Sequence, residues 1–308
     1  MKKIYLWLLL AALVGLTGCE KAEFSQSGVR AAVPQTRATS LGDFYRMATV
    51  EANNVDPRNA GEYLLSDSTR FFTHIALWGA TIGGDRLNRV YLSFTKELKQ
   101  VLDNPQQYIE PLQAKGIKVL LWVEGDQSGA GFSNLTAAQI ETFTDALTAY
   151  DSRVDGYFLN DEWAAYGINN WPAANSTSYS NLVVALRRKT DKMLCVYDRG
   201  YSCYFSNEIA SYIERCCCPQ LNGYCTTPGF EIPLTRYCPY MIDLDMPPSE
   251  RVVKARTTMS VNRDAGGIFF EKVPGAPNRL STFNAVASAF GMTCTHTGVI
   301  YPKDYPVN

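Results

Sequence analysis

Short apolar runs rich in β-branched and aromatic residues alternate with helical periods along this chain, and this alternation constrains its fold most. Such runs, separated by amphipathic segments, predict βα units arranged around a parallel sheet. A (β/α)8 barrel of the TIM type usually takes about 250 residues, so residues 41–308 suit one barrel domain. The predicted strands are Phe71–Leu77, Arg89–Phe94, Ile117–Val123, Val154–Asn160, Met193–Tyr197 and Gly267–Glu271.

The clearest predicted helix lies between the third and fourth of these strands. Thr136 and Gln139 form a capping-box pair at its start. Apolar residues then recur at spacings of three and four, at Ala137, Ile140, Phe143, Leu147 and Tyr150. Further helices are predicted at Ser178–Lys189, Ser249–Asn262 and Arg279–Phe290.

The N-terminus has the pattern of a bacterial lipoprotein signal. Lys2 and Lys3 precede an apolar run that is too short to span a membrane and that ends in Leu16-Thr17-Gly18-Cys19. We expect residues 1–18 to be removed and Cys19 to be lipidated, which would anchor the protein to the outer membrane or the cell surface. Residues 19–40 are small and polar without an apolar period, as is typical of a flexible tether.

Charge and cysteine content exclude some classes of function. Removing residues 1–18 deletes two lysines and no acid, which takes the formal net charge from −1 to −3, so no nucleic-acid partner is expected. Export permits disulfides, but eight cysteines after Cys19 allow too many pairings to assign any. A zinc cluster at Cys216, Cys217 and Cys218 with Cys225 is an alternative, although the run lacks a C-x2-C spacing.

The strand that begins at Val154 carries the candidate chemistry. Because side chains alternate along a strand, Phe158, Asn160 and Glu162 share one face and Asp161 points to the other. The carboxyl edge of a barrel sheet is where catalytic groups lie, so Glu162 is placed as a catalytic acid. Trp163 and Tyr166 follow on the loop, where flat rings suit stacking against sugars.

This stretch resembles the signature D-x-x-D-x-D-x-E of family 18 glycoside hydrolases, in the variant of the bacterial endo-β-N-acetylglucosaminidases of the endoglycosidase H and F type. The likeness begins at Val90-Tyr91-Leu92-Ser93-Phe94 and runs through Gly116–Leu121 and Gly129-Ala130-Gly131-Phe132. It ends with Asp155-Gly156, Asp161-Glu162 and Tyr166-Gly167, and a weaker likeness covers residues 267–290.

The resemblance implies a substrate-assisted mechanism. In that mechanism a glutamate, here Glu162, protonates the glycosidic oxygen while the 2-acetamido group of the substrate attacks the anomeric carbon. The aspartate that orients this group falls on Asn160, the aspartate behind it falls on Phe158, and the first aspartate is kept as Asp155. An amide can hydrogen-bond but supplies no charge, and losing one well-placed electrostatic group typically costs about 10² to 10³ in rate.

Two functions remain open from the sequence. One is a cell-surface protein that recognises the GlcNAc-GlcNAc core of N-glycans with weakened or lost hydrolysis, and that passes glycans to partner uptake proteins. The other is an active endo-β-N-acetylglucosaminidase with Glu162 as acid and base. The pair Phe158 and Asn160 favours the first.

Four more residues are candidates for sugar contact, and no cofactor or metal is implied. Trp78 and Trp122 lie at or near predicted strand ends, where a tryptophan either floors a sugar subsite or packs in the core. Asn222 and Tyr224 lie where the resemblance implies contacts to the acetamido group.

The lipoprotein hypothesis predicts that Cys19→Ser abolishes membrane attachment, because the lipid would be carried on that thiol. Partition of the expressed chain into a detergent phase measures attachment. Equal partition of the wild type and the variant would contradict the prediction.

Overall fold

The computed structural model describes residues 43–198, 205–218, 232–238, 241–261 and 265–305. Asn222, Tyr224, Cys225 and the predicted signal and tether lie outside the described residues. No helix within those described ranges is long and apolar enough to cross a membrane.

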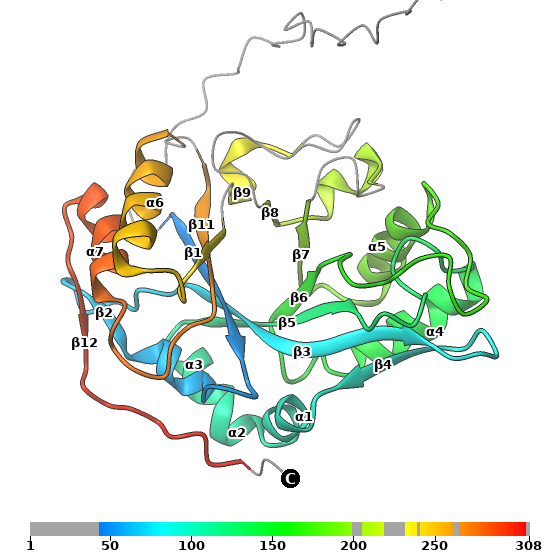
Figure 1. Cartoon of the computed structure of the whole chain (residues 1–308), viewed down its shortest axis with the longest axis horizontal. Helices are drawn as coiled ribbons and strands as arrows, with labels where there is room; N and C mark the ends of the chain where they lie inside the picture. The colour runs from blue at the N-terminus through cyan, green and yellow to red at the C-terminus, as the bar shows by residue number, and fades with distance from the viewer. Residues whose placement is uncertain (1–42, 199–204, 219–231, 239–240, 262–264, 306–308) are drawn as a thin grey trace, which may run out of the picture. The chain divides into compact units, whose positions relative to one another are not determined.

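A parallel sheet curves into a nearly closed barrel with helices outside it (Figure 1). Its strands follow the order β10-β11-β1-β3-β5-β6-β7-β8-β9, and each neighbouring pair in this order is parallel. The expected barrel of the TIM type is therefore confirmed. The strands are β1 (Tyr45–Glu51), β3 (His74–Gly84), β5 (Lys118–Gly125), β6 (Gly156–Leu159), β7 (Met193–Tyr197), β8 (Arg215–Cys217), β9 (Tyr237–Cys238), β10 (Met241–Asp243) and β11 (Gly267–Glu271).

One predicted strand has a different place in the sheet. Strand β4 (Val90–Phe94) does not start a βα unit of the barrel but runs antiparallel to β3, so that Gly84 pairs with Val90. The turn is tight because Asp85 accepts hydrogen bonds from the backbone N–H groups of Leu87 and Arg89. Such a local hairpin competes with a crossover connection wherever two strands are joined by only a few residues.

Helices cover the outside of the sheet at most of the predicted places. The capping box of α4 is confirmed, with Thr136 and Gln139 bonded reciprocally. The helix at 178–189 is also confirmed, and that predicted at 279–290 ends as a 3-10 turn, η5 (Ser288–Phe290). The helices are α1 (Lys96–Asp103), α2 (Pro105–Tyr108), α3 (Glu110–Ala114), α4 (Ala137–Thr148), α5 (Ser178–Lys189), α6 (Pro248–Val261) and α7 (Leu280–Ala287).

Short elements complete the chain. Strands β2 (Tyr63–Leu65) and β12 (Cys294–His296) form a separate antiparallel pair. The remaining 3-10 turns are η1 (Pro57–Glu62), η3 (Asn207–Ser211) and η4 (Leu234–Arg236).

The sheet separates two hydrophobic cores. The outer core lies between strands and helices and includes Tyr157 and Leu159 of β6. The inner core fills the barrel and includes Phe158, so the predicted alternation along β6 is confirmed. The inner core consists of Met47, Ala76, Leu120, Trp122, Phe158, Cys195, Tyr197, Cys217, Cys238 and Phe269.

The two cores separate the cysteines that a zinc cluster at Cys216, Cys217 and Cys218 would have to bring together. Cys216 and Cys218 belong to the outer core and Cys217 belongs to the inner core, because neighbouring residues of a strand point to opposite faces. Among the described residues, no group of three or more His, Cys, Asp or Glu side chains is arranged to hold a metal ion.

The buried His74 predicts acid sensitivity. Its ring stacks on Tyr45 with centroids 4.5 Å apart, and burial lowers its pKa to about 3, with the charge of Arg215 acting in the same direction. The unfolded chain takes up this proton near pH 6.5 and the folded protein does not, so stability falls as the pH drops from about 6.5 toward 3. This one site lowers the free energy of unfolding by at most about 1.4 kcal/mol per pH unit.

We therefore expect His74→Phe to lose less stability than the wild type between pH 6.5 and pH 4. The phenyl ring keeps the stack on Tyr45 and has no titratable nitrogen. Urea unfolding at several pH values measures the two slopes, and equal slopes would show that His74 does not cause the acid sensitivity.

Candidate active site at the carboxyl end of the barrel

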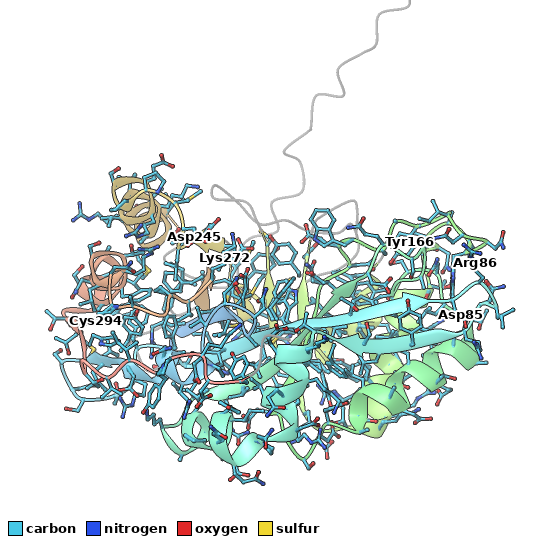
Figure 2. The ribbon with its side chains drawn as sticks, turned by 60° about the horizontal axis from the view of Figure 1, so that its bottom comes forward. Asp85, Arg86, Tyr166, Asp245, Lys272 and Cys294 are labelled. Atoms are coloured by element: carbon cyan, nitrogen blue, oxygen red, sulfur yellow. The ribbon has the colours of Figure 1, made fainter. Side chains whose placement is uncertain are left out.

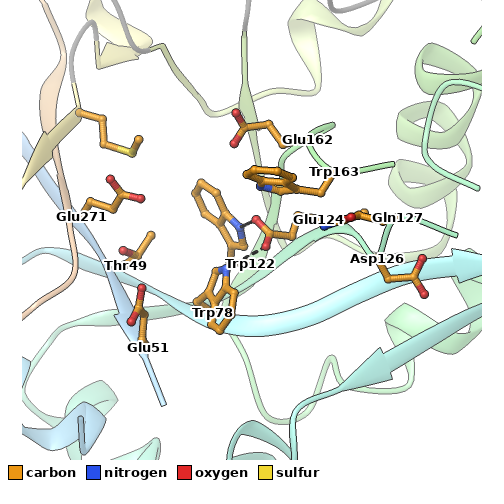
Figure 3. Close-up of a pocket in the computed structure, with 12 residues that line it drawn as sticks. Thr49, Glu51, Trp78, Trp122, Glu124, Asp126, Gln127, Glu162, Trp163 and Glu271 are labelled. Carbon is orange, nitrogen blue, oxygen red and sulfur yellow. Dashed lines mark hydrogen bonds between the residues drawn. The ribbon is translucent and has the colours of Figure 1, made fainter. Parts of the chain in front are cut away.

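A pocket of about 450 Å³ opens where the strands of the barrel end. Glu51, Thr49 and Glu271 lie on one side, and Glu124, Glu162 and Trp163 lie on the other (Figure 3). Strand ends of this kind carry the active site in barrel enzymes. The lining consists of Thr49, Glu51, Trp78, Trp122, Glu124, Gly125, Asp126, Gln127, Glu162, Trp163, Met241 and Glu271.

Glu162 and Asn160 lie together at the end of β6, as the alternation predicts. The backbone N–H of Asn160 donates to the Val123 carbonyl at 2.9 Å and continues the pairing of β5 with β6. Its side chain is fully buried, and its Nδ2 donates to Oε2 of Glu162 at 2.8 Å. Its Oδ1 has no hydrogen-bond partner in the described part of the chain. An amide oxygen without a partner is costly to bury, so a donor from a ligand would stabilise it.

Glu124 is a pocket carboxylate that the sequence analysis missed. It follows the predicted strand at 117–123 directly and shares the inward face with Trp122, so the alternation along β5 was a signal for it. The indole N–H of Trp122 donates to it at 2.9 Å and that of Trp78 at 3.0 Å. Burial raises the pKa of Glu124 and the nearby charge of Glu162 adds to this, while hydrogen bonds from the two indoles and from the side chain of Asn160 act in the opposite direction.

Phe158 lies below the pocket, where the family motif has an acid. Its ring stacks on that of Trp122 with centroids 4.5 Å apart and an interplanar angle of 19°. Phe269 from β11 completes the stack, 5.4 Å from Phe158 and 5.9 Å from Trp122. Trp122 is only 4% exposed, so most of its ring is packed in the inner core. Its indole N–H donates to Glu124, which lines the pocket.

Trp163 forms the exposed rim of the pocket. Its side chain is 60% exposed and its backbone has a φ of 63°, which is unusual for a bulky residue. Two backbone hydrogen bonds hold this segment, from Gly125 to Glu162 and from Gln127 to Trp163, both at 2.7 Å. A Cβ at Gly125 would come within 2.4 Å of the backbone of Ala164, so only glycine permits this crossing.

Two residues that the sequence predicts for the site, the motif aspartate Asp155 and the loop residue Tyr166, do not line the pocket. Asp155 lies at the other end of β6, where it accepts hydrogen bonds from the backbone of Val119 and from Gln113 and pairs with Lys118. Tyr166 donates its hydroxyl to Asp161 and lies toward the end of the molecule that carries the β3–β4 hairpin (Figure 2). Asp161 points away from Glu162, as its place in the strand predicts.

Glu271, on the side of the pocket opposite Glu124, adds to the negative charge of the pocket. Burial raises the pKa of Glu271; the charge of Lys272 opposes this effect, and the charges of Asp243, Glu51 and Glu162 add to it. A neutral polyol or a cation is therefore a more suitable ligand than an anion.

Two curated proteins resemble this chain over about half of its length. Over 158 residues, the chain is 35% identical to an endo-β-N-acetylglucosaminidase of Flavobacterium sp. (strain SK1022), covering 50% of this chain and 50% of that protein. It is 30% identical over 180 residues to endo-β-N-acetylglucosaminidase F1 of Elizabethkingia meningoseptica, covering 56% and 52%. The resemblance to endo-β-N-acetylglucosaminidases is confirmed. The chain spans about half the length of these curated relatives, and no protein-family model matches it.

Solved structures show that the barrel fold of this chain is shared with known glycan-cleaving enzymes. EndoBT-3987 of Bacteroides thetaiotamicron, solved with a Man5GlcNAc product and with a Man9GlcNAc2Asn substrate, superposes with a TM-score of 0.71 at 18% identity. The match covers 87% of this chain and 65% or 70% of that chain. A GH18 chitinase from Pseudoalteromonas aurantia gives a TM-score of 0.51 at 14% identity, covering 80% and 99%.

The ring stack predicts that the motif acid cannot simply be restored at residue 158. We expect Phe158→Asp to lower the free energy of unfolding by about 3 to 5 kcal/mol, because it removes a buried ring and places a carboxyl group without partners in its position. The control Phe158→Leu is expected to cost only about 1 to 2 kcal/mol. Urea unfolding compares the two, and equal stability would mean that the barrel interior accommodates an acid.

Proposed function

We propose that the pocket recognises the GlcNAc-GlcNAc core of N-glycans and that hydrolysis of this core is weakened or lost. The observation that carries the proposal is the pair at the end of β6, in which Glu162 reaches the pocket beside a neutral Asn160. The tryptophans Trp78 and Trp163, which line the same pocket, supply ring surfaces of the kind that sugars stack on. The names of the relatives, and the glycans bound to EndoBT-3987, support the choice of ligand.

The expected chemistry has three parts. Glu162 protonates the glycosidic oxygen, the 2-acetamido oxygen of the substrate attacks the anomeric carbon, and the acetamido N–H needs an acceptor. The Oδ1 of Asn160 has no partner among the described residues and is an acceptor of the right kind, and it could meet that N–H only if the groups that bury it move aside. No charge at residue 160 then balances the positive oxazolinium that forms, so the barrier to its formation remains higher than with an aspartate.

The residue beside Glu162 also matters for the supply of the proton. The Nδ2 group of Asn160 donates to Oε2 of Glu162 at 2.8 Å. A general acid must hold its proton before the reaction. If residue 160 were an aspartate, its carboxyl group and that of Glu162 would share one proton. The amide of Asn160 cannot share a proton with Glu162 in this way.

The alternative is an active endo-β-N-acetylglucosaminidase that uses Glu162 as acid and base. One observation favours it, which is that Glu124 brings a second carboxylate to the same wall of the pocket. In either case we propose that the protein is lipidated at Cys19 and exposed on the outer membrane or cell surface. There it would act on glycoproteins and pass glycans to uptake proteins.

Glycan release from a high-mannose glycoprotein tests this function. We expect the wild type to release little glycan and Asn160→Asp to release at least about tenfold more, because the added carboxyl group balances charge and shares a proton with Glu162. Intact mass of the glycoprotein measures the single GlcNAc that is left after cleavage.

Two matched variants define the result. Asn160→Ala removes the amide without adding charge and should not increase release, and Glu162→Gln should abolish whatever release remains. Rapid release by the wild type that depends on Glu162 would establish the alternative. Failure of the wild type to bind the glycan at all would overturn both functions.

A further inference from the structure

The family motif does not explain Glu124, a carboxylate of β5 that lines the pocket on the same side as Glu162. We propose that Glu124 carries the negative charge that the motif would place at residues 158 and 160, and that it faces the substituent on C2 of the bound amino sugar. This inference rests on the proposed function, because it assumes that an amino sugar occupies the pocket.

The position of Glu124 supports this role. Val123 pairs with Leu159, and the backbone N–H of Asn160 donates to the Val123 carbonyl, so residues 124 and 160 lie next to each other on neighbouring strands. Both side chains project toward the barrel axis at the same level. A glutamate at 124 therefore reaches the same part of the pocket as an aspartate at 160, from the adjacent strand.

The hydrogen bonds of Glu124 favour its ionised form, in opposition to the burial that raises its pKa. An ionised carboxylate only accepts hydrogen bonds, and the indole N–H groups of Trp78 and Trp122 each donate to a different oxygen of Glu124 (Figure 3). Each carboxylate oxygen accepts more than one hydrogen bond, so acceptor capacity remains for a ligand after both indoles are satisfied.

The ring stack accounts for the position of the acid at 124. Trp122 and Phe158 are in register on β5 and β6, and their rings fill the level below the pocket. An acid at 158 would be buried against two rings, whereas Glu124 lies one level higher and lines the pocket. Compared with an acid at residue 158, Glu124 places the negative charge on the neighbouring strand and one level higher. There it remains within reach of the sugar.

A charge at this place predicts a particular ligand preference. A sugar with a protonated 2-amino group gains an attraction to Glu124 that a neutral 2-acetamido group lacks, and ion pairs in partly buried sites are stronger than in water. We expect the wild type to bind chitobiose whose non-reducing sugar has lost its acetyl group at least as tightly as it binds N,N′-diacetylchitobiose. The measurement is calorimetric titration with both disaccharides, at a pH where the amine is protonated.

Three variants make the test specific. Glu124→Gln keeps the shape and removes the charge, and we expect it to weaken binding of the amine by about tenfold more than binding of the acetamide. Glu124→Asp keeps the charge and should retain the preference of the wild type. Glu271→Gln removes a carboxylate from the opposite wall of the pocket and should change the ratio of the two affinities less than Glu124→Gln does.

Each outcome decides a different point. If Glu124→Gln weakens both disaccharides equally, Glu124 only holds the two tryptophans and the inference is wrong. If Glu271→Gln changes the ratio as much as Glu124→Gln, the preference comes from the total charge of the pocket and the inference is also wrong. If the wild type binds neither disaccharide, the proposed function itself fails, and this result is distinct from the other two.

Discussion

Inside the barrel, the rings of Trp122, Phe158 and Phe269 lie nearly parallel, with centroids 4.5, 5.4 and 5.9 Å apart. The neighbouring strands β5 and β6 supply Trp122 and Phe158, and β11, which is separated from β5 by β1 and β3, supplies Phe269. The stack therefore fills the interior and joins two walls of the barrel. Large rings packed in this way leave no room for water or for a charged group at that level. The polar chemistry of the site is therefore confined to the level above, at the strand ends.

The pocket lies directly above the ring stack, and acidic side chains line it. The edge of Trp122 that faces the pocket carries its N–H, and this donor needs an acceptor, which Glu124 provides. Glu51, Glu162 and Glu271 line the same pocket from other strands. Confining several carboxylates near an apolar floor raises the pKa of Glu124 and of Glu271, mainly through burial.

Close packing and hydrogen bonds hold the backbone at the rim of the pocket. The segment after β6 crosses the loop after β5 at Gly125, where the backbones approach too closely for any other residue. Trp163 keeps a positive φ at this crossing, and such strain persists only where the surrounding hydrogen bonds enforce it. The backbone that carries the Trp163 ring is thus in place before any ligand arrives, which lowers the entropic cost of binding.

Strand and helix periods in the sequence determined the barrel, the capping box of α4 and the inward face that Phe158, Asn160 and Glu162 share. These features depend on neighbours within a few residues, which a single sequence displays. The tertiary structure alone decided that β4 folds back on β3, and that Asp155 accepts hydrogen bonds from Val119 and Gln113. It also decided that Glu124 joins Trp78 and Asn160. The contacts of Asp155 and Glu124 join segments far apart in the chain, and their register is set by packing of the whole barrel, which no local period records.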